Sequence, residues 1–252
     1  MEGWRYKKIN MISKAKLKEL AAYRQQKVQD AEGVFVVEGA KMAAEALAAG
    51  AEVLYTCATS EWPMAGGQWS VGEYYEVSQS ELERLSLMRA PNQVWMVVRR
   101  AENGGRSVDG SPLVLALDRL QDPGNMGTIM RTADWYGVRR IVCSRDTVSC
   151  YNPKVVQASM GAVFRTRVEY VDLPKWLATC GMEVYGATLD GEPVKGGQDK
   201  PAVLLIGNEG RGVSAEALAT VTRRVTIPNL GGTAESLNAA VAAAILIDRL
   251  LG

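Results

Sequence analysis

Short apolar segments alternate with helix-like segments from residue 113 to residue 252, and this alternation constrains the fold more than any other feature of the sequence. Residues 113–117 are all apolar, as expected for a strand covered on both faces of a parallel sheet. Strands that alternate with helices in this way predict a mostly parallel α/β sheet. The expected strands are 113–117, 140–143, 167–170, 183–187, 202–206 and 224–227, and the expected helices are 128–136, 153–160, 174–180, 214–219 and 235–250.

A second, shorter alternation precedes this region. Ser13 can cap a helix that runs to about Gln29, and further short strands and helices follow up to residue 99. We therefore predict a small α/β domain over residues 11–99, which together with the N-terminal residues forms a first domain of residues 1–99. A polar, glycine-rich linker is expected at 100–112, and a second domain at 113–252. The expected elements of the first domain are strands 34–37, 53–57, 74–77 and 94–98 and helices 40–49 and 78–87.

The composition excludes several classes of chemistry. Histidine is absent, which removes Ser-His-Asp hydrolysis and His-ligated metals. No two of the four cysteines form a C-x-x-C pair, so we expect neither a metal site nor dithiol redox chemistry. The longest apolar run, residues 239–247, is too short to cross a membrane, and the N-terminus has no hydrophobic signal segment. We expect a cytoplasmic protein without a membrane partner.

Positive charge gathers at the N-terminus. Residues 1–27 carry eight Lys and Arg residues against Glu2 and Glu19, although the whole chain has a net charge of only +1. A basic arm on a slightly acidic body suggests a handle for an anionic polymer. A solvated helix face would explain the same charges.

The first of three polar loops follows the strand at 113–117 and runs from Asp118 to Gly127. Arg131 is expected in the first turn of the next helix, where the helix dipole disfavours a cation. A bound anion such as a phosphate would explain this placement. The structural alternative is an ion pair of Arg131 with Asp118, Asp122 or Asp134.

The second and third loops follow the strands at 202–206 and 224–227. The second, residues 207–212, has the spacing G-x-x-G-x-G, which matches neither a dinucleotide-binding fold nor a P-loop. The third leads to Ser236 and Asn238, expected on the first turn of the last helix, where helix capping is an alternative role. Since ligands of parallel sheets bind beyond the carboxyl ends of the strands, the three loops predict one site.

These loops resemble the three motifs of the SpoU (TrmH-type) RNA ribose 2′-O-methyltransferases of the SPOUT class. Residues 117–133 are similar to motif 1, residues 205–212 to motif 2, and residues 227–228 with 235–238 to motif 3. Residues 151–162 resemble the segment that this family carries between motifs 1 and 2. Arg24 and residues 35–39 resemble the family's RNA-binding domain, whose fold is like that of certain ribosomal proteins.

The resemblance implies a trefoil knot near the C-terminus and a homodimer whose sites are completed across the interface. It also implies methyl transfer from S-adenosylmethionine to a ribose 2′-hydroxyl of RNA, with ribosomal RNA favoured over transfer RNA. The residues at the family's catalytic positions are Asn125, Arg131, Glu209, Ser236 and Asn238. The residues expected around the cofactor are Thr188, Gly207, Ile227 and Leu237.

The chain departs from the family in its third motif. One additional residue lies between Pro228 and Glu235, and Asn229 stands where the family usually has Met. We expect Arg131 to clamp a substrate phosphate rather than act as a base, because a guanidinium has a pKa above about 12. Asn125 and Asn238 are expected to fix Arg131 and the loop, and Glu209 to orient its partner groups. An inactive RNA-binding relative and a base methyltransferase are the alternative functions.

Overall fold

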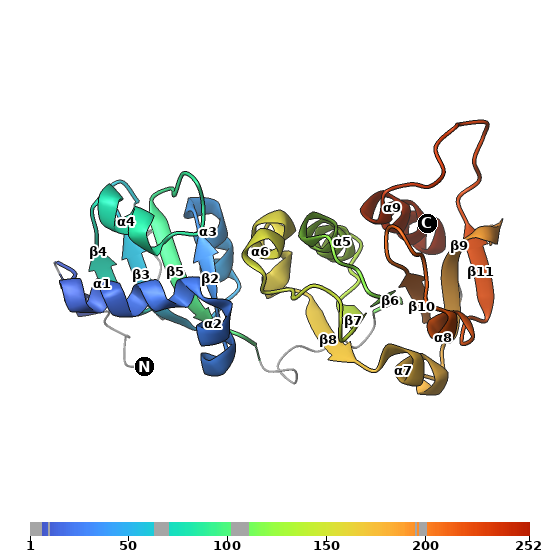
Figure 1. The fold of residues 1–252 in the computed structure, drawn as a ribbon, viewed down its shortest axis with the longest axis horizontal. Helices are drawn as coiled ribbons and strands as arrows, with labels where there is room; N and C mark the ends of the chain where they lie inside the picture. Colours follow the sequence, from blue (N-terminus) through green and yellow to red (C-terminus); the bar gives the residue numbers. More distant parts are fainter. Residues whose placement is uncertain (1–6, 10, 63–70, 102–110, 195, 197–200) are drawn as a thin grey trace. The chain divides into compact units, whose positions relative to one another are not determined.

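The computed structural model describes residues 7–9, 11–62, 71–101, 111–194, 196 and 201–252 (Figure 1). The chain forms two compact units, the first made of residues 1–102 and 151–164 and the second of residues 103–150 and 165–252. Residues 151–164 therefore belong to the first unit, although in sequence they lie inside the predicted second domain. Most of the predicted linker, residues 102–110, lies outside the described residues, as do residues 1–6 of the basic arm.

The second unit is built on a six-stranded sheet in which every strand pairing is parallel. This confirms the predicted α/β class. β6 and β10 lie side by side at the centre, are buried at every residue, and end together, because Leu117 pairs with Ile206. Across the sheet, the order is β11 (Arg223–Thr226), β9 (Glu183–Pro193), β10 (Ala202–Ile206), β6 (Leu113–Leu117), β7 (Arg140–Ser144) and β8 (Arg167–Val171).

Two helices of this unit begin at positions that differ from the prediction. α5 starts at Pro123 instead of residue 128, because Asp122 caps it and proline suits the first helical position. α9 starts at Ala239 instead of residue 235, because Asn238 is its N-cap. The helices of the second unit are α5 (Pro123–Trp135), α7 (Leu173–Thr179), α8 (Ala215–Leu218) and α9 (Ala239–Leu251).

The first unit contains a five-stranded mixed sheet. β1 (Lys7–Ile9) and β4 (Val71–Glu76) are parallel to each other, and β4 is parallel to β3 (Val53–Ala58). β5 (Val94–Arg99) is antiparallel to both β3 and β2 (Val34–Glu38). The helical segments are α1 (Lys14–Leu20), η1 (Ala21–Arg24), α2 (Gln26–Glu32), α3 (Ala40–Ala48), α4 (Gln79–Leu85), α6 (Pro153–Ser159) and η2 (Ala162–Phe164).

The single helix predicted from Ser13 to Gln29 is wrong, since the chain is broken between η1 and α2. Gln25 has an extended backbone at the break. The buried side-chain amide of Gln29 donates to the backbone carbonyl of Tyr23 at 2.7 Å. The side chain of Gln29 thus takes the place of the backbone N–H that would bond to the Tyr23 carbonyl in a continuous helix. This contact depends on tertiary burial rather than on local sequence.

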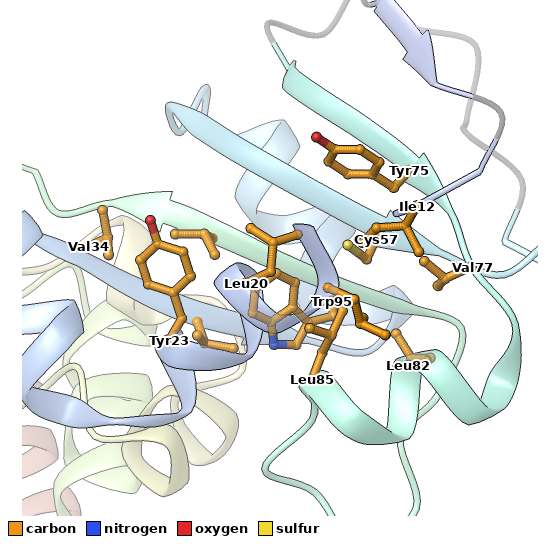
Figure 2. Packing of buried hydrophobic residues seen from close by; sticks show 13 residues of the cluster. Ile12, Leu20, Tyr23, Val34, Cys57, Tyr75, Val77, Leu82, Leu85 and Trp95 are labelled. Carbon is orange, nitrogen blue, oxygen red and sulfur yellow. The ribbon is translucent and has the colours of Figure 1, made fainter. Parts of the chain in front are cut away.

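The core of the first unit surrounds Trp95, whose side chain is fully buried (Figure 2). Leu20 from α1 and Leu85 from α4 pack against it. On β2, Phe35 stacks on Tyr151 and Phe164 at ring-centroid distances of 4.8 and 5.8 Å. These aromatic contacts attach residues 151–164 to the first unit.

Candidate active site

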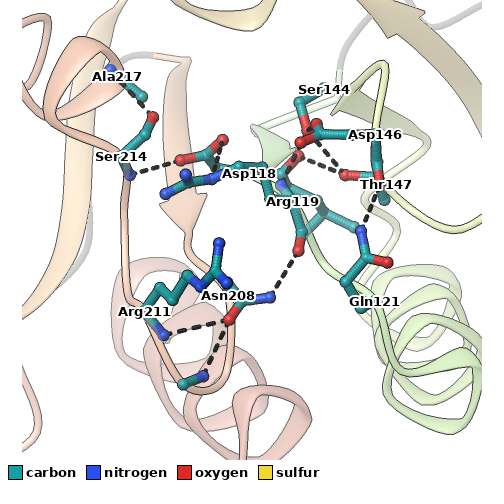
Figure 3. A network of polar contacts seen from close by, with 12 residues as sticks. Asp118, Arg119, Gln121, Ser144, Asp146, Thr147, Asn208, Arg211, Ser214 and Ala217 are labelled. Carbon is teal, nitrogen blue, oxygen red and sulfur yellow. Dashed lines mark hydrogen bonds and ion pairs between the residues drawn. The ribbon is translucent and has the colours of Figure 1, made fainter.

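The first and second polar loops are joined where they leave the sheet. The backbone N–H of Asp118 donates to the carbonyl of Ile206 at 2.9 Å. The side-chain amide of Asn208 donates to the carbonyl of Arg119 at 2.8 Å (Figure 3). Asn208 also pairs through its backbone with Gly212, which closes the second loop on itself. The two loops therefore form one rigid edge above β6 and β10.

Three of the five predicted catalytic residues meet in a chain of hydrogen bonds. The side-chain amide of Asn125 donates to Oε1 of Glu209 at 2.8 Å. The amide of Asn238 donates to Oδ1 of Asn125, also at 2.8 Å. Each residue comes from a different loop, and 84 and 113 positions separate the bonded pairs in sequence. The structure thus brings the three loops together as expected, and we call Asn125, Glu209 and Asn238 the cross-loop triple.

Asn238 has two roles at once. Its Oδ1 accepts from the backbone N–H of Ala240 at 2.9 Å and caps α9, which is the structural alternative that its sequence position suggested. Its Nδ2 remains available and donates to Asn125. Ser236 is exposed on the segment before the cap, so its expected place on the first turn of the helix is wrong. Its side chain has no hydrogen bond within the described part of the chain.

Arg131 is the ninth residue of α5, not a first-turn residue, because the helix begins at Pro123. The dipole at the start of the helix therefore does not act on this guanidinium, since its effect falls off within the first turn. Arg131 lies six residues after Asn125, about 9 Å along the helix and about 120° around it, so the two side chains occupy different faces. The guanidinium is exposed, and among the described residues it contacts none of the cross-loop triple.

The predicted structural partners of Arg131 are occupied elsewhere. Asp122 accepts the backbone N–H of Asn125 at 2.7 Å, and Asp134 pairs with Arg165 at 2.8 Å. Asp118 pairs with Arg119 and accepts a backbone N–H. The structural alternative for Arg131 is wrong, and its charge is available to a ligand.

A buried polar network, which the sequence analysis did not single out, lies beneath the loops. Asp118 is 2% exposed, and its Oδ2 accepts from the backbone N–H of Ser214 at 2.6 Å. The backbone N–H of Arg119 donates to Oγ of Ser144 at 2.8 Å, and Ser144 also contacts Thr147 (Figure 3). The signal for this network in the sequence is that polar residues directly follow wholly apolar strands. This network fixes the positions from which the loops start.

Three of the four predicted cofactor residues lie in or directly after neighbouring strands, and the fourth, Leu237, precedes α9. Thr188 lies where the pairing of β9 with β11 is interrupted, since Gly186 pairs with Arg224 and the next pair joins Glu192 to Val225. The strand residues between Gly186 and Glu192 therefore lack regular ladder pairing with β11, although Oγ1 of Thr226 donates to the carbonyl of Leu189 at 3.4 Å. Gly207 follows β10, Ile227 follows β11, and Leu237 is half exposed before α9.

Gly207 is required by the loop itself. A Cβ at this position would lie 2.2 Å from the carbonyl carbon of Gly212, closer than atoms can approach. The close approach at Gly207 is therefore to the protein's own backbone. Leu189 in β9 and Leu230 in the third loop are exposed apolar side chains. Exposed apolar side chains on segments without regular strand pairing suit the adenosine part of S-adenosylmethionine, so the residues present fit this cofactor.

The lengthened third loop forms a local turn around Asn229. Its Oδ1 accepts from the backbone N–H groups of Gly231 at 3.0 Å and Gly232 at 2.7 Å. Gly231 has a φ of +106°, which an L side chain rarely adopts. The additional residue is thus accommodated within the loop, and Asn238 still reaches Asn125.

Two further observations concern metals and membranes. Within the described residues, no group of three or more Cys, Asp or Glu side chains could hold a metal ion. No helix in the same part of the chain is both long and apolar enough to cross a membrane.

Comparison with known proteins gives consistent matches along both units. Residues 112–248 match the SpoU rRNA Methylase family, and residues 14–95 match the MRM3-like substrate binding domain. The 23S rRNA (guanosine(2553)-2′-O)-methyltransferase RlmP of Bacillus subtilis is 31% identical over 98% of this chain and 100% of its own length.

Solved structures agree over nearly the whole chain. A TrmH-family protein from Porphyromonas gingivalis is 36% identical with a TM-score of 0.85, covering 96% of this chain and 98% of that one. An AdoMet-bound rRNA methyltransferase from Sinorhizobium meliloti is 27% identical with a TM-score of 0.78, covering 97% of each chain.

Proposed function

Because this chain belongs to the SpoU rRNA Methylase family, we propose that it transfers the methyl group of S-adenosylmethionine to a ribose 2′-hydroxyl of ribosomal RNA. The observation that carries this proposal is the cross-loop triple of Asn125, Glu209 and Asn238 beside the predicted cofactor loops. The B. subtilis relative is named as a 23S rRNA 2′-O-methyltransferase, which supports ribosomal RNA as the substrate.

The cofactor supplies a methyl group on a sulfonium centre, and its transfer needs the hydroxyl in line with that methyl group. Positioning of this kind can lower a barrier by roughly 7–11 kcal/mol. In this chain, Asn125 and Asn238 hold each other and Glu209, and do not hold Arg131 as we expected from the sequence. The cross-loop triple therefore sets the shape of the three loops, and Arg131 lies on a different face of α5 from Asn125.

The positions of Arg131 and the exposed Trp135 favour an interface with a second protomer. Trp135 lies one helical turn after Arg131, so both side chains occupy the same face of α5. Trp135 is 86% exposed, and Trp is enriched among the residues that protein–protein interfaces cover. We therefore propose a homodimer in which this face of α5 is covered and Arg131 acts near the partner's site.

Replacement of Trp135 by Glu tests the dimer. We expect the variant to sediment as a monomer and to lose methyl transfer, because a buried carboxylate in an apolar interface is costly. Met11→Glu is the matched control, since Met11 is 81% exposed in the first unit. A dimeric and active Trp135→Glu variant would contradict the proposed interface.

The first unit is proposed to bind the RNA. Its match to a substrate-binding domain supports this role, as do the exposed cations Lys14, Lys18 and Lys27 on α1 and α2. Lys16 does not contribute, because its ammonium pairs with Glu19 at 2.8 Å. The C-terminal trefoil knot and a cytoplasmic location remain predictions, the first supported by the likeness of the second unit to TrmH-family structures.

Transfer of tritium from labelled S-adenosylmethionine to ribosomal RNA tests the function. After nuclease digestion, we expect label in resistant dinucleotides, because a 2′-O-methyl group blocks cleavage at the adjacent phosphate. Label in modified bases would instead establish a base methyltransferase. Binding of RNA without label would establish an inactive RNA-binding protein.

Arg131→Lys tests the role of Arg131. A phosphate clamp predicts weaker RNA binding, because lysine cannot make the bidentate contact of a guanidinium. The single-turnover rate at saturating RNA should then fall only modestly. Unchanged RNA affinity with a collapsed rate would reject the clamp and favour proton abstraction by Arg131.

A further inference from the structure

A cavity of about 280 Å³ opens in the second unit, at the carboxyl ends of β6, β7 and β8. None of the residues assigned above to catalysis or to the cofactor lines it. The loops after three strands contribute its walls, together with the start of α8. The lining residues are Asp118, Arg119, Ser144, Arg145, Asp146, Val171, Asp172, Leu173, Pro174, Ser214 and Glu216.

The cavity lies at the switch point of the sheet. β6 and β10 are neighbours, but the chain leaves β6 toward β7 on one side and leaves β10 toward β11 on the other. Open parallel sheets bind ligands beyond the strand ends at such a point. Arg119 follows β6, and Glu216 lies in the helix that follows β10, so the cavity occupies this position.

Charged groups of both signs face the cavity. Arg145 and Glu216 are exposed, and neither has a hydrogen bond or ion pair to another residue in the described ranges. Asp118 is occupied by Ser214 and Arg119. The available groups are therefore a guanidinium donor and a carboxylate acceptor, and Val171, Leu173 and Pro174 add apolar surface to the same cavity.

This combination suits the edge and face of a nucleobase. Arg donates to the acceptors of a base edge, and a carboxylate accepts from its amino groups. A guanidinium plane also provides a stacking surface for an unpaired base. Inorganic phosphate fits poorly, because Asp146, Asp172 and Glu216 would repel it, and a simple cation would meet Arg119 and Arg145.

The cavity is linked to the candidate active site by two adjacent residues. Asn208 donates to the carbonyl of Arg119, which lines the cavity. The next residue, Glu209, accepts from Asn125 of the cross-loop triple. One short loop thus contacts both the cavity and the candidate active site. This fits a single RNA strand that passes from the active site to the cavity.

We propose that this cavity receives an unpaired nucleobase adjacent to the ribose that is methylated, with Arg145 and Glu216 reading its edge. The inference rests on the proposed function for the identity of the ligand as part of an RNA substrate. It adds a specificity site outside the cofactor loops.

Binding of the four ribonucleosides to the full-length protein tests this proposal by ligand-observed NMR. S-adenosylhomocysteine at saturating concentration fills the cofactor site, so that adenosine cannot bind there. We expect saturable binding of at least one nucleoside, weakened about tenfold by Arg145→Gln and by Glu216→Gln, as for loss of one base-edge contact. Arg139→Gln is the matched control, because Arg139 and Arg145 flank opposite ends of β7; it should bind as the wild type does.

Absence of saturable binding by every nucleoside, or binding that both pocket variants leave unchanged, would overturn the proposal. Methyl transfer to ribosomal RNA is measured on the same proteins. The pocket variants should raise the KM for RNA with little change in kcat. Nucleoside binding by a wild type that methylates no RNA would reject the proposed function and leave the pocket established.

Discussion

Two polar networks lie at the same strand ends, and they differ in burial. The network of Asp118, Ser144 and Ser214 is almost completely buried, whereas the cross-loop triple lies near the surface. A buried polar group must keep its partner, because leaving it unsatisfied costs about 1–3 kcal/mol. An exposed group can exchange its partner for water or substrate at little cost. The buried network therefore holds the loops in place, and the residues of the cross-loop triple are free to take part in the reaction.

The largest expected effect is on activity and follows from replacing Asn125, the central residue of the cross-loop triple. Asn125→Ala deletes both bonds of the triple. We expect a fall in the single-turnover methyl-transfer rate of about 10²-fold, because loops that shift by about 1 Å misplace the reacting groups, with a nearly unchanged free energy of unfolding. Thr128→Ala is the control, since Thr128 is exposed on α5 and, among the described residues, its hydroxyl bonds only to the carbonyl of Gly124.

The next effect is on stability and follows from breaking the buried network. Asp118→Ala leaves the buried N–H of Ser214 without its acceptor and Arg119 without its ion pair. We expect a loss of about 2–3 kcal/mol in the free energy of unfolding, measured with urea. Asp172→Ala should cost only about 1 kcal/mol, because Asp172 is an exposed helix cap. Equal losses in the two variants would show that burial does not make the bonds of Asp118 more costly to lose than those of an exposed cap.

The smallest effect concerns a second buried carboxylate, in the first unit. Burial raises the pKa of Glu38, although Ser86 and the backbone N–H of Leu87 donate to it. The folded state then holds this proton more tightly than the unfolded state. The contribution of protonated Glu38 to the free energy of unfolding is full below pH 4.5, the usual pKa of the carboxyl group. It is lost as pH rises through the higher pKa that Glu38 has in the folded state.

Urea unfolding between acid and neutral pH measures this contribution. We expect Glu38→Gln to be less dependent on pH than the wild type, because the amide does not ionise. Glu83→Gln is the control, since Glu83 is exposed on α4 and should leave the pH dependence unchanged. A wild type that gains stability from Glu38 as pH rises would contradict the assigned direction.

The sequence was sufficient for the parallel sheet and for the convergence of the loops. Apolar strands such as Leu113–Leu117 can be buried on both faces only in such a sheet, and parallel strands place their carboxyl ends on one edge. That geometry brings the loops to one edge, whereas packing decides that Asn125, Glu209 and Asn238 bond there. Asp122 followed by Pro123 is also a helix-start signal, so the sequence itself carries the early start of α5 and the position of Arg131 beyond the first turn.

The tertiary structure alone decided which contacts these residues make. The break between η1 and α2 depends on the burial of Gln29, and the attachment of residues 151–164 to the first unit depends on Phe35. Likewise, only the fold shows that Asp118 is occupied by Ser214 while Arg131 is left exposed. Local sequence determines periodicity and capping, which act within a few residues. Pairings between residues about a hundred positions apart depend on packing, which no local pattern encodes.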